Sequence, residues 1–343
     1  MIKNIQALRA LAAVMVVFYH LKLLLVTLHV PDLGSSGVDL FFVISGFVMV
    51  HTTRAQPPSS FEFARNRIAR IVPIYWLMTC GVFFVAMIAP SLLGSTRADP
   101  SDLIRSLLFI PFTKGNGQIQ PVLFVGWTLN YEMFFYAIFA VGLMMRNYTN
   151  GIIFTAIGIL AVFLLGNLFR TDNVLQVFYS NVIILEFALG MGVAYFTDAM
   201  PKTAPTPVKL LTLTSLLAIP ILFAAPALWT NVSRIFTCGL SAVVVVTGAV
   251  LLERWGWRIR SALVMAVGDA SYILYLSHPY ITQVVQKLGL RIHATGLVSV
   301  ALIVGCIALV VVVSLVLHAK VDRPLSRAVR RVLLVQRMQA RPA

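Results

Sequence analysis

The feature that most constrains this 343-residue chain is a succession of apolar segments, each close to the twenty residues that a helix needs to cross a bilayer. Hydrophobic residues make up 59% of the chain and charged residues 11%, which excludes an ordinary soluble globular domain. Because helices satisfy their own backbone groups in lipid, we predict an all-α polytopic membrane protein of about ten transmembrane helices. The predicted spans are 5–28, 37–53, 71–90, 122–145, 151–169, 174–196, 210–228, 235–252, 261–282 and 297–318.

The basic residues favour a topology with both chain ends in the cytoplasm. Lys and Arg number 27 against 12 Asp and Glu, which gives a net charge of +15. If the N-terminus lies inside, 19 of the 27 basic residues fall in cytoplasmic segments, the bias typical of membrane proteins. We assign this charge to topology and to contact with membrane lipid, not to nucleic-acid binding. The predicted parts are a transmembrane domain at 1–319 and a basic cytoplasmic tail at 320–343.

The cysteines and the short motifs give no sign of a metal. Cys80, Cys238 and Cys306 all lie in apolar stretches, a pattern that suggests neither a disulfide framework nor a zinc site. The sequence contains no HExxH, phosphate-binding P-loop, GxSxG or CxxC pattern. We therefore expect no metal cofactor.

The first predicted span carries two ionisable residues, Arg9 and His20. Eleven residues make about three helical turns and a rise of roughly 16 Å, so the two side chains point to the same side. A histidine at such a depth can act as a general base, and an arginine near the inner face can hold a phosphate. The alternative is a topological anchor followed by a histidine that is hydrogen-bonded in the core.

The second span opens with GVDLFFVISGF and places Asp39 just inside the membrane. This span enters from the outer side, whereas His20 is approached from the inner side, so the two residues could lie at a similar depth. Asp39 would then orient His20, as an acidic partner orients a catalytic imidazole. The alternative is that Asp39 caps its own helix.

The stretch RNRIARIVPIYW precedes the third span and contains Arg67 and Arg70. Residues three apart are neighbours on one helical face, and the planar guanidinium recognises phosphate well. These residues are therefore candidates for a phosphate site. The positive-inside bias explains the same cluster without any site.

Two later segments place further polar residues among apolar ones. In WTLNYEMFFY, Glu132 is a catalytic candidate, since a glutamate inside the bilayer must be paired, hydrogen-bonded or protonated. The glutamate could also be purely structural, and His278 could merely cap a helix that is broken by the following proline. The residues that we take as candidates for substrate binding, from the two segments WTLNYEMFFY and SYILYLSHP, are Trp127, Tyr131, Tyr136, Tyr275 and His278.

Five stretches of the chain together resemble the acyltransferase 3 family of bacterial membrane O-acyltransferases. They occur in order from residue 6 to residue 279, so the resemblance covers most of the chain. Within the family, IQALRALAA and the compact length are most similar to exopolysaccharide O-acetyltransferases of the succinoglycan type. The five stretches are QALRALAAVMVVFYH, GVDLFFVISGF, RNRIARIVPIYW, WTLNYEMFFY and SYILYLSHP.

The resemblance implies a multi-pass protein of the bacterial inner membrane that transfers an acyl group. The donor in this family is usually acetyl-CoA, and the acceptor is a sugar hydroxyl of a polysaccharide, a lipopolysaccharide or a lipid-linked oligosaccharide precursor. The family's essential arginine and histidine match Arg9 and His20. Its RxxR element matches Arg67 and Arg70.

We therefore expect an acyl-CoA-dependent O-acyltransferase. His20 would deprotonate the acceptor hydroxyl or carry the acyl group covalently. Arg9, Arg67 and Arg70 would bind the CoA phosphates, and the rise from Arg9 to His20 is comparable to the reach of a pantetheine arm.

Two other classes of protein share these features. A transporter or flippase of a lipid-linked sugar would also have buried polar residues and a basic inner face. A non-catalytic subunit of a polysaccharide assembly complex would tolerate substitution of Arg9 and His20. Hydrolysis of acetyl-CoA by the purified protein, lost on replacing His20, distinguishes the enzyme from both.

Overall fold

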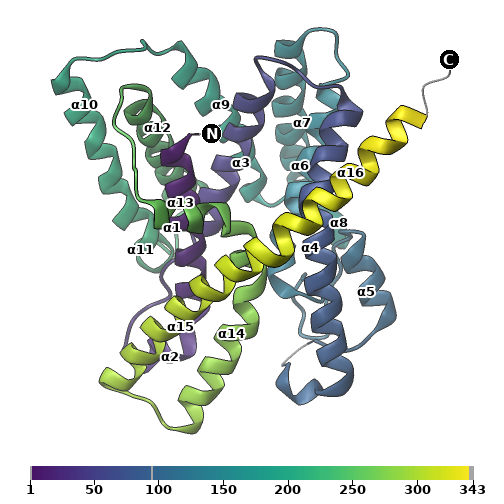
Figure 1. Ribbon diagram of the computed structural model, residues 1–343, viewed down its shortest axis with the longest axis vertical. Helices are drawn as coiled ribbons and strands as arrows, with labels where there is room; N and C mark the ends of the chain where they lie inside the picture. Colours follow the sequence, from purple (N-terminus) through teal and green to yellow (C-terminus); the bar gives the residue numbers. More distant parts are fainter. Residues whose placement is uncertain (1, 94–95, 340–343) are drawn as a thin grey trace. The chain divides into compact units, whose positions relative to one another are not determined.

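The structure, a computed structural model, describes residues 2–93 and 96–339. The described residues form helices and helical turns but no strand, with a single bridge between Thr113 and Ile119. The predicted all-α class is confirmed. The chain divides into two compact units, the first comprising α1–α3 and α9–α15 and the second α4–α8 and α16. Figure 1 labels these helices along the chain.

The first unit combines two stretches of the chain, Met1–Thr52 and Leu185–Val316. The helices α4–α8 of the second unit lie between these stretches in the sequence. Short 3-10 and π-helical turns at Thr214–Leu217 and Ile235–Gly239 lead into the neighbouring helices α11 and α12. Its helices are α1 (Lys3–Tyr19), α2 (Lys22–Val26), α3 (Gly37–Thr53), α9 (Leu185–Ala199), α10 (Thr206–Leu213), α11 (Ala218–Leu228), α12 (Leu240–Arg254), α13 (Ala262–Asp269), α14 (Ser271–Arg291) and α15 (Gly296–Leu317).

Helix α1 is the centre of the first unit and packs against α12, α13 and α14. Small residues allow these neighbours to approach closely, as is common between membrane helices. A Cβ added to Gly268 of α13, for example, would overlap the backbone oxygen of Gln6. The N-terminus of α1 is fixed from α12, because the Glu253 carboxylate accepts hydrogen bonds from the backbone N–H groups of Lys3 and Asn4 at 2.8 and 2.6 Å.

Helices α3 and α9 of the first unit also meet through glycine. A Cβ at Gly46 would overlap the backbone oxygen of Phe187, and a Cβ at Gly190 would overlap that of Val43. The two backbones therefore lie in direct contact, which only glycine permits at these positions. This contact brings the polar residues of α3 and α9 close together.

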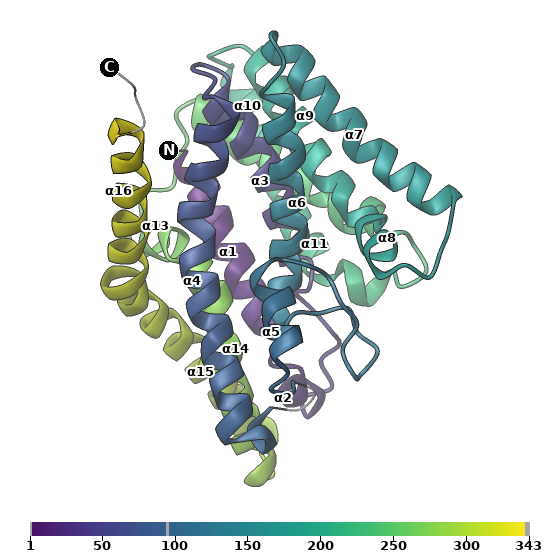
Figure 2. The same ribbon diagram turned by 90° about the vertical axis from the view of Figure 1, so that its right-hand side faces the viewer.

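The second unit is built on α4, which packs against α5, α6 and α16, while α7 packs on α6. Figure 2 shows α16 running beside α4. Short turns at Pro90–Leu92, Phe124–Gly126 and His318–Asp322 precede α5, α6 and α16. The helices of this unit are α4 (Ser60–Ile88), α5 (Pro100–Leu107), α6 (Trp127–Gly142), α7 (Tyr148–Leu168), α8 (Val174–Tyr179) and α16 (Arg323–Gln339).

Seven helical segments of the described chain are long and apolar enough to cross a membrane, as expected of a multi-pass membrane protein. The predicted spans 5–28, 37–53 and 261–282 also correspond to helices, but these are too short or too polar for that criterion. They are the spans that carry His20, Asp39 and His278: α1 and α3 have 17 residues each, one fewer than the criterion requires, and α3 is otherwise apolar. The seven segments are Ser60–Ile88, Phe124–Gly142, Tyr148–Leu168, Val182–Ala199, Thr206–Leu228, Ile235–Arg254 and Gly296–Val332.

The first predicted span differs from the structure in one respect that concerns the site. It is not a single helix over 5–28, because α1 ends at Tyr19 and α2 begins at Lys22. His20 and Leu21 have ψ angles of 2° and 19°, outside the helical range, and they interrupt the helix. His20 therefore lies at a helix end, not in the middle of a continuous span.

Candidate functional site

His20 is the residue at which α1 stops. Its ring Nδ1 lies 2.8 Å from the backbone oxygen of Val16, one turn earlier. A carbonyl oxygen only accepts hydrogen bonds, so Nδ1 carries the hydrogen and the lone pair of the neutral ring is on Nε2. The geometry therefore suits a general base.

His278 and Tyr275, both on α14, lie beside His20. The Nε2 of the fully buried His278 is 3.2 Å from the Nδ1 of His20, and their ring centroids are 4.9 Å apart. The Tyr275 ring lies 5.9 Å from that of His278 and 6.0 Å from that of Phe41 on α3. The first unit thus brings together three of the residues that were candidates from the sequence.

Arg9 lies on α1, the helix that His20 terminates, and is linked through Gln6 to the neighbouring helix α13. The side chain of Gln6 accepts a hydrogen bond from Arg9 Nη1 at 3.4 Å and donates one to the Asp269 carboxylate at 2.5 Å. Asp269 is the last residue of α13. Three residues from two helices therefore fix the side of α1 on which the guanidinium lies.

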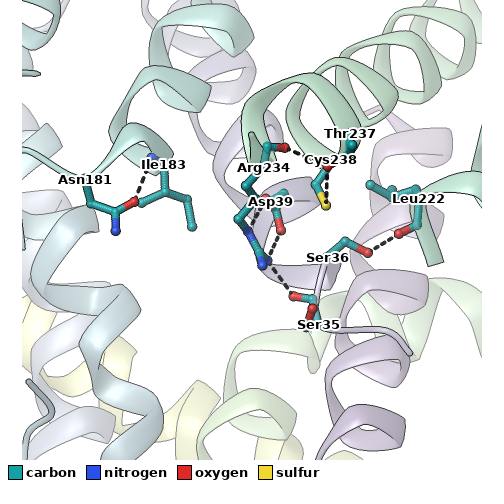
Figure 3. Close-up of polar contacts among 9 residues, drawn as sticks. All are labelled: Ser35, Ser36, Asp39, Asn181, Ile183, Leu222, Arg234, Thr237 and Cys238. Atoms are coloured by element: carbon teal, nitrogen blue, oxygen red, sulfur yellow. Dashed lines mark hydrogen bonds and ion pairs between the residues drawn. The ribbon is translucent and has the colours of Figure 1, made fainter. Parts of the chain in front are cut away.

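Asp39 has a different partner from the one that its position in the sequence suggested. Its carboxylate is fully buried and accepts two hydrogen bonds from Arg234, one from Nε at 2.7 Å and one from Nη2 (Figure 3). Arg234 also donates to the backbone oxygen of Ser35 at 3.2 Å. The expected contact of Asp39 with His20 does not occur among the described residues. A bidentate guanidinium satisfies both carboxylate oxygens, which a single imidazole nitrogen cannot do.

Glu186 adds a second buried carboxyl group to this pair. It lies on α9, is fully buried, and neither of its oxygens has a hydrogen-bond donor within the part of the chain that the structure describes. The Asp39 carboxyl is within hydrogen-bonding reach of it. Two carboxyl groups can bond to each other only if one is protonated. Because the Asp39 carboxylate is bound by Arg234, we interpret Glu186 as the protonated member.

The second unit contains Arg67 and Arg70, both on α4. The Arg67 guanidinium carbon lies 5.3 Å from the ring centre of Phe63 and 5.8 Å from that of Tyr136, within the range of cation–π contacts. Its Nε is buried and has no hydrogen-bond partner within the described ranges, whereas Arg70 is exposed. An arginine with an unfilled buried donor is suited to receive an anion.

Residues of α6 complete the polar part of the second unit. The Tyr136 hydroxyl donates a hydrogen bond to Glu132 one turn away, so this pair lies next to Arg67. Tyr131 instead is a packing residue, because its ring stacks on Phe178 with centroids 4.1 Å apart and its hydroxyl donates to the Phe178 backbone oxygen at 2.8 Å. The Trp127 ring packs edge-on against Tyr131.

Two residues of these clusters, Arg234 and Glu186, were not candidates for a functional site from the sequence. Arg234 counted only as a basic residue of an outer segment, and Glu186 was not selected at all. A glutamate within an apolar span could have indicated Glu186, because ionisable groups inside a membrane usually pair with another polar group. Their partner Asp39 could not be found by spacing, since it lies 195 residues from Arg234 in the chain.

No group of three or more His, Cys, Asp or Glu side chains that could hold a metal ion occurs among residues 2–93 and 96–339.

A family model described as an acyltransferase domain matches residues 2–319. The chain belongs to this acyltransferase family. The resemblance found in the sequence is thereby confirmed, and family membership supports a transferase activity that uses an acyl donor.

Named relatives extend this assignment. The chain is 33% identical to the exopolysaccharide production protein ExoZ of Rhizobium meliloti, over 87% of this chain and 92% of that protein. It is 27% identical to the putative membrane-bound transacylase BcsY of Komagataeibacter xylinus, over 94% of this chain and 82% of that protein. The acyltransferase MdmB of Streptomyces mycarofaciens is 24% identical over 89% of this chain and 84% of its own length. No solved structure matches the chain.

Proposed function

We propose that this acyltransferase moves an acyl group, acetyl foremost, from acyl-CoA to a sugar hydroxyl of an exopolysaccharide or its lipid-linked precursor. The observation that carries the proposal is the ring of His20, which has its Nδ1 bound to the Val16 backbone oxygen and its lone pair on Nε2. A relative named for exopolysaccharide production supports the choice of a polysaccharide acceptor. The family assignment supports an acyl donor.

His20 is the general base of the proposed reaction. Its Nε2 takes the proton of the acceptor hydroxyl as the hydroxyl oxygen forms a bond to the thioester carbonyl carbon. The carbon–sulfur bond then breaks, and the proton on Nε2 passes to the departing sulfur. The products are an ester and a free thiol, with no net gain or loss of protons. A base in this position typically contributes about 10²- to 10⁴-fold to the rate.

The arginines are the proposed phosphate-binding residues. In the first unit Arg9 is anchored through Gln6 to α13. In the second unit the unfilled Nε of Arg67 and the exposed guanidinium of Arg70 would bind anionic groups of the donor. The proposed contacts to sugar hydroxyls are made within each unit separately, by Tyr275 in the first and by Glu132 with Tyr136 in the second, since hydroxyl and carboxyl groups are the usual partners of sugar hydroxyls.

The proposed membrane topology keeps ten crossings. In addition to the seven long apolar segments, α1, α3 and α14 would cross, because polar side chains in a bundle interior do not contact lipid. The excess of basic residues in the inner segments supports a topology in which both termini would lie in the cytoplasm, with the protein in a bacterial inner membrane. The segment 1–319 would then be the transmembrane domain and 320–343 the basic tail.

The test is an assay of purified protein in liposomes with acetyl-CoA and the host polysaccharide. We expect release of CoA thiol together with acetylation of the polysaccharide, detected by mass spectrometry. The His20→Ala variant should lose at least about 100-fold in rate while it inserts and folds normally. His51→Ala is the matched control, since His51 is an exposed histidine of α3. Near-normal acetylation by a well-folded His20→Ala protein would contradict the proposal, and so would movement of a lipid-linked sugar without thiol release.

A further inference from the structure

A second histidine accompanies the candidate base. His278 lies in the middle of α14, its side chain is fully buried, and its Nε2 is 3.2 Å from the Nδ1 of His20. The two residues lie 258 positions apart in the chain, so the contact comes from the packing of α14 on α1. From the sequence, His278 was a candidate for substrate binding. Its burial argues for a different role.

The hydrogen bonds of the two rings determine which nitrogens carry hydrogen. The Nδ1 of His278 lies 3.3 Å from the backbone oxygen of Leu274, which can only accept. Nδ1 of His278 is therefore protonated in the neutral ring, and its Nε2 is an acceptor. That acceptor faces the Nδ1–H of His20, which it shares with the Val16 backbone oxygen. One pair of tautomers, with both rings neutral and the hydrogen of each on Nδ1, accounts for all these contacts.

The proline after His278 strengthens this assignment. Pro279 has no N–H, so the backbone oxygen of Tyr275 loses the donor that it would have in a regular helix. That oxygen lies within hydrogen-bonding reach of the His278 ring together with the oxygen of Leu274. Both oxygens only accept hydrogen bonds, and Nδ1 is the nitrogen that reaches the oxygen of Leu274, so the hydrogen of the neutral ring lies on Nδ1. The His–Pro sequence thus directs the lone pair of His278 Nε2 toward His20.

We infer that His278 is a positioning residue that keeps the hydrogen of His20 on Nδ1 and its lone pair on Nε2, the atom that takes the substrate proton. The inference rests on the proposed function of His20. In many catalytic sites a carboxylate accepts a hydrogen bond from the imidazole and so holds its tautomer. His278 has this role toward His20 but is a neutral acceptor. A neutral acceptor requires no buried negative charge beside His20, and the carboxylate of Asp39 is already bound to Arg234.

The kinetic test compares two substitutions of His278. In His278→Leu the acceptor is lost at similar volume, and we expect kcat to fall about 10- to 1,000-fold with little change in either KM. In His278→Gln the side-chain oxygen can reach the position of Nε2 and accept from His20, so activity should recover in part. Ser277→Ala, the adjacent buried residue of α14, is the control for general disturbance of the helix. A raised KM for the sugar with kcat unchanged would overturn the inference in favour of substrate binding.

A second measurement does not depend on activity. Nitrogen-15 spectra of protein labelled at histidine, with the His20 signals assigned by their loss in His20→Ala, report which nitrogen carries hydrogen. We expect the Nδ1–H form of His20 in the wild type and a larger share of the Nε2–H form in His278→Leu, in which the Val16 backbone oxygen is the remaining acceptor. An Nε2–H form in the wild type would overturn the inference. A wild-type protein with the Nδ1–H form but no reaction with acetyl-CoA would refute the proposed function alone.

Discussion

Arg234 donates two hydrogen bonds to the buried carboxylate of Asp39, although the two residues come from helical segments far apart in the chain. The arginine side chain is 34% exposed, whereas that of Asp39 is completely enclosed. The pair therefore joins the start of α3 to the π-helical turn Ile235–Gly239 that begins α12. Removing one member of such a pair leaves the other charge without compensation.

Arg234→Met should be strongly destabilising. The substitution leaves the Asp39 carboxylate buried without a cation, which typically costs about 3–5 kcal/mol in the free energy of unfolding. Thermal unfolding in detergent measures the loss. Arg258→Met, at an exposed arginine of the same unit, is the control and should change little. Equal melting temperatures for Arg234→Met and the wild type would show that the pair does not hold these helices together.

Glu186→Gln should be tolerated, because we interpret Glu186 as the protonated member of the cluster. The amide keeps the shape of a neutral carboxyl group and can donate a hydrogen bond to Asp39. We expect a change in the free energy of unfolding below about 1 kcal/mol, whereas Glu186→Ala should cost more because it leaves a cavity. A Glu186→Gln protein that unfolds as easily as Arg234→Met would mean that Glu186 is ionised in the folded state.

Gly190→Ala should destabilise the contact between α3 and α9. A methyl group at this position overlaps the backbone oxygen of Val43, so the helices must separate, at a typical cost of about 1–3 kcal/mol. Gly192 on the same helix has no atom within 4 Å of an added Cβ, so Gly192→Ala is the matched control. That control should be neutral or slightly stabilising, since alanine favours helix over glycine by about 1 kcal/mol. The same effect of both variants on the melting temperature would contradict the close contact.

Arg67→Ala should weaken binding of CoA more than Arg70→Ala. Loss of a charge-assisted hydrogen bond costs about 1.5–3 kcal/mol, or roughly tenfold or more in affinity, and the unfilled buried donor belongs to Arg67. Arg67→Lys should recover only part of the affinity, because lysine has no Nε donor. Calorimetric titration with CoA gives the constants, with the exposed Arg146→Ala as control. Unchanged affinity for both alanine variants would show that these arginines do not bind CoA and contribute only to the membrane topology.

Lys114 should titrate unusually early for a lysine. It lies in the loop before α6, where its ammonium group donates to the Thr96 hydroxyl at 3.0 Å and the Val122 backbone oxygen at 3.3 Å. Burial lowers the pKa of Lys114 to about 8, although the nearby Asp102 opposes this change. Competitive labelling of amines should show a midpoint near this pH for Lys114. A midpoint near 10.5, the usual value for lysine, would contradict it.

The same pKa has a consequence for stability. Between about pH 8 and 10.5 the unfolded chain binds a proton at Lys114 that the folded chain does not bind. Stability therefore rises with pH in this window and is independent of this group below it. Protease resistance of the loop at pH 7.5 and 9.5 measures the effect. In Lys114→Met the dependence should disappear, whereas in Lys22→Met, at an exposed lysine, it should persist.

Much of this protein follows from local sequence. Helical structure follows from apolar runs that must satisfy their own backbone in lipid, and Arg9 lies within α1 as this pattern predicts, although the helix ends before His20. The second predicted span, 37–53, coincides with helix α3 (Gly37–Thr53), which is a further case of structure that follows from local sequence. These properties depend on residues within a few turns of each other, so the sequence alone determines them.

The partners of the polar residues depend on how the helices pack. Asp39 was expected to meet His20, but the packing of α3 on α9 and the segment after α11 gives it Arg234 and Glu186 instead. His20 meets His278 because α14 packs on α1. Separations of 195 and 258 residues leave no periodic signal in the sequence. Only the tertiary structure decides such pairs, because each is selected by the side chains that close packing brings within hydrogen-bonding distance.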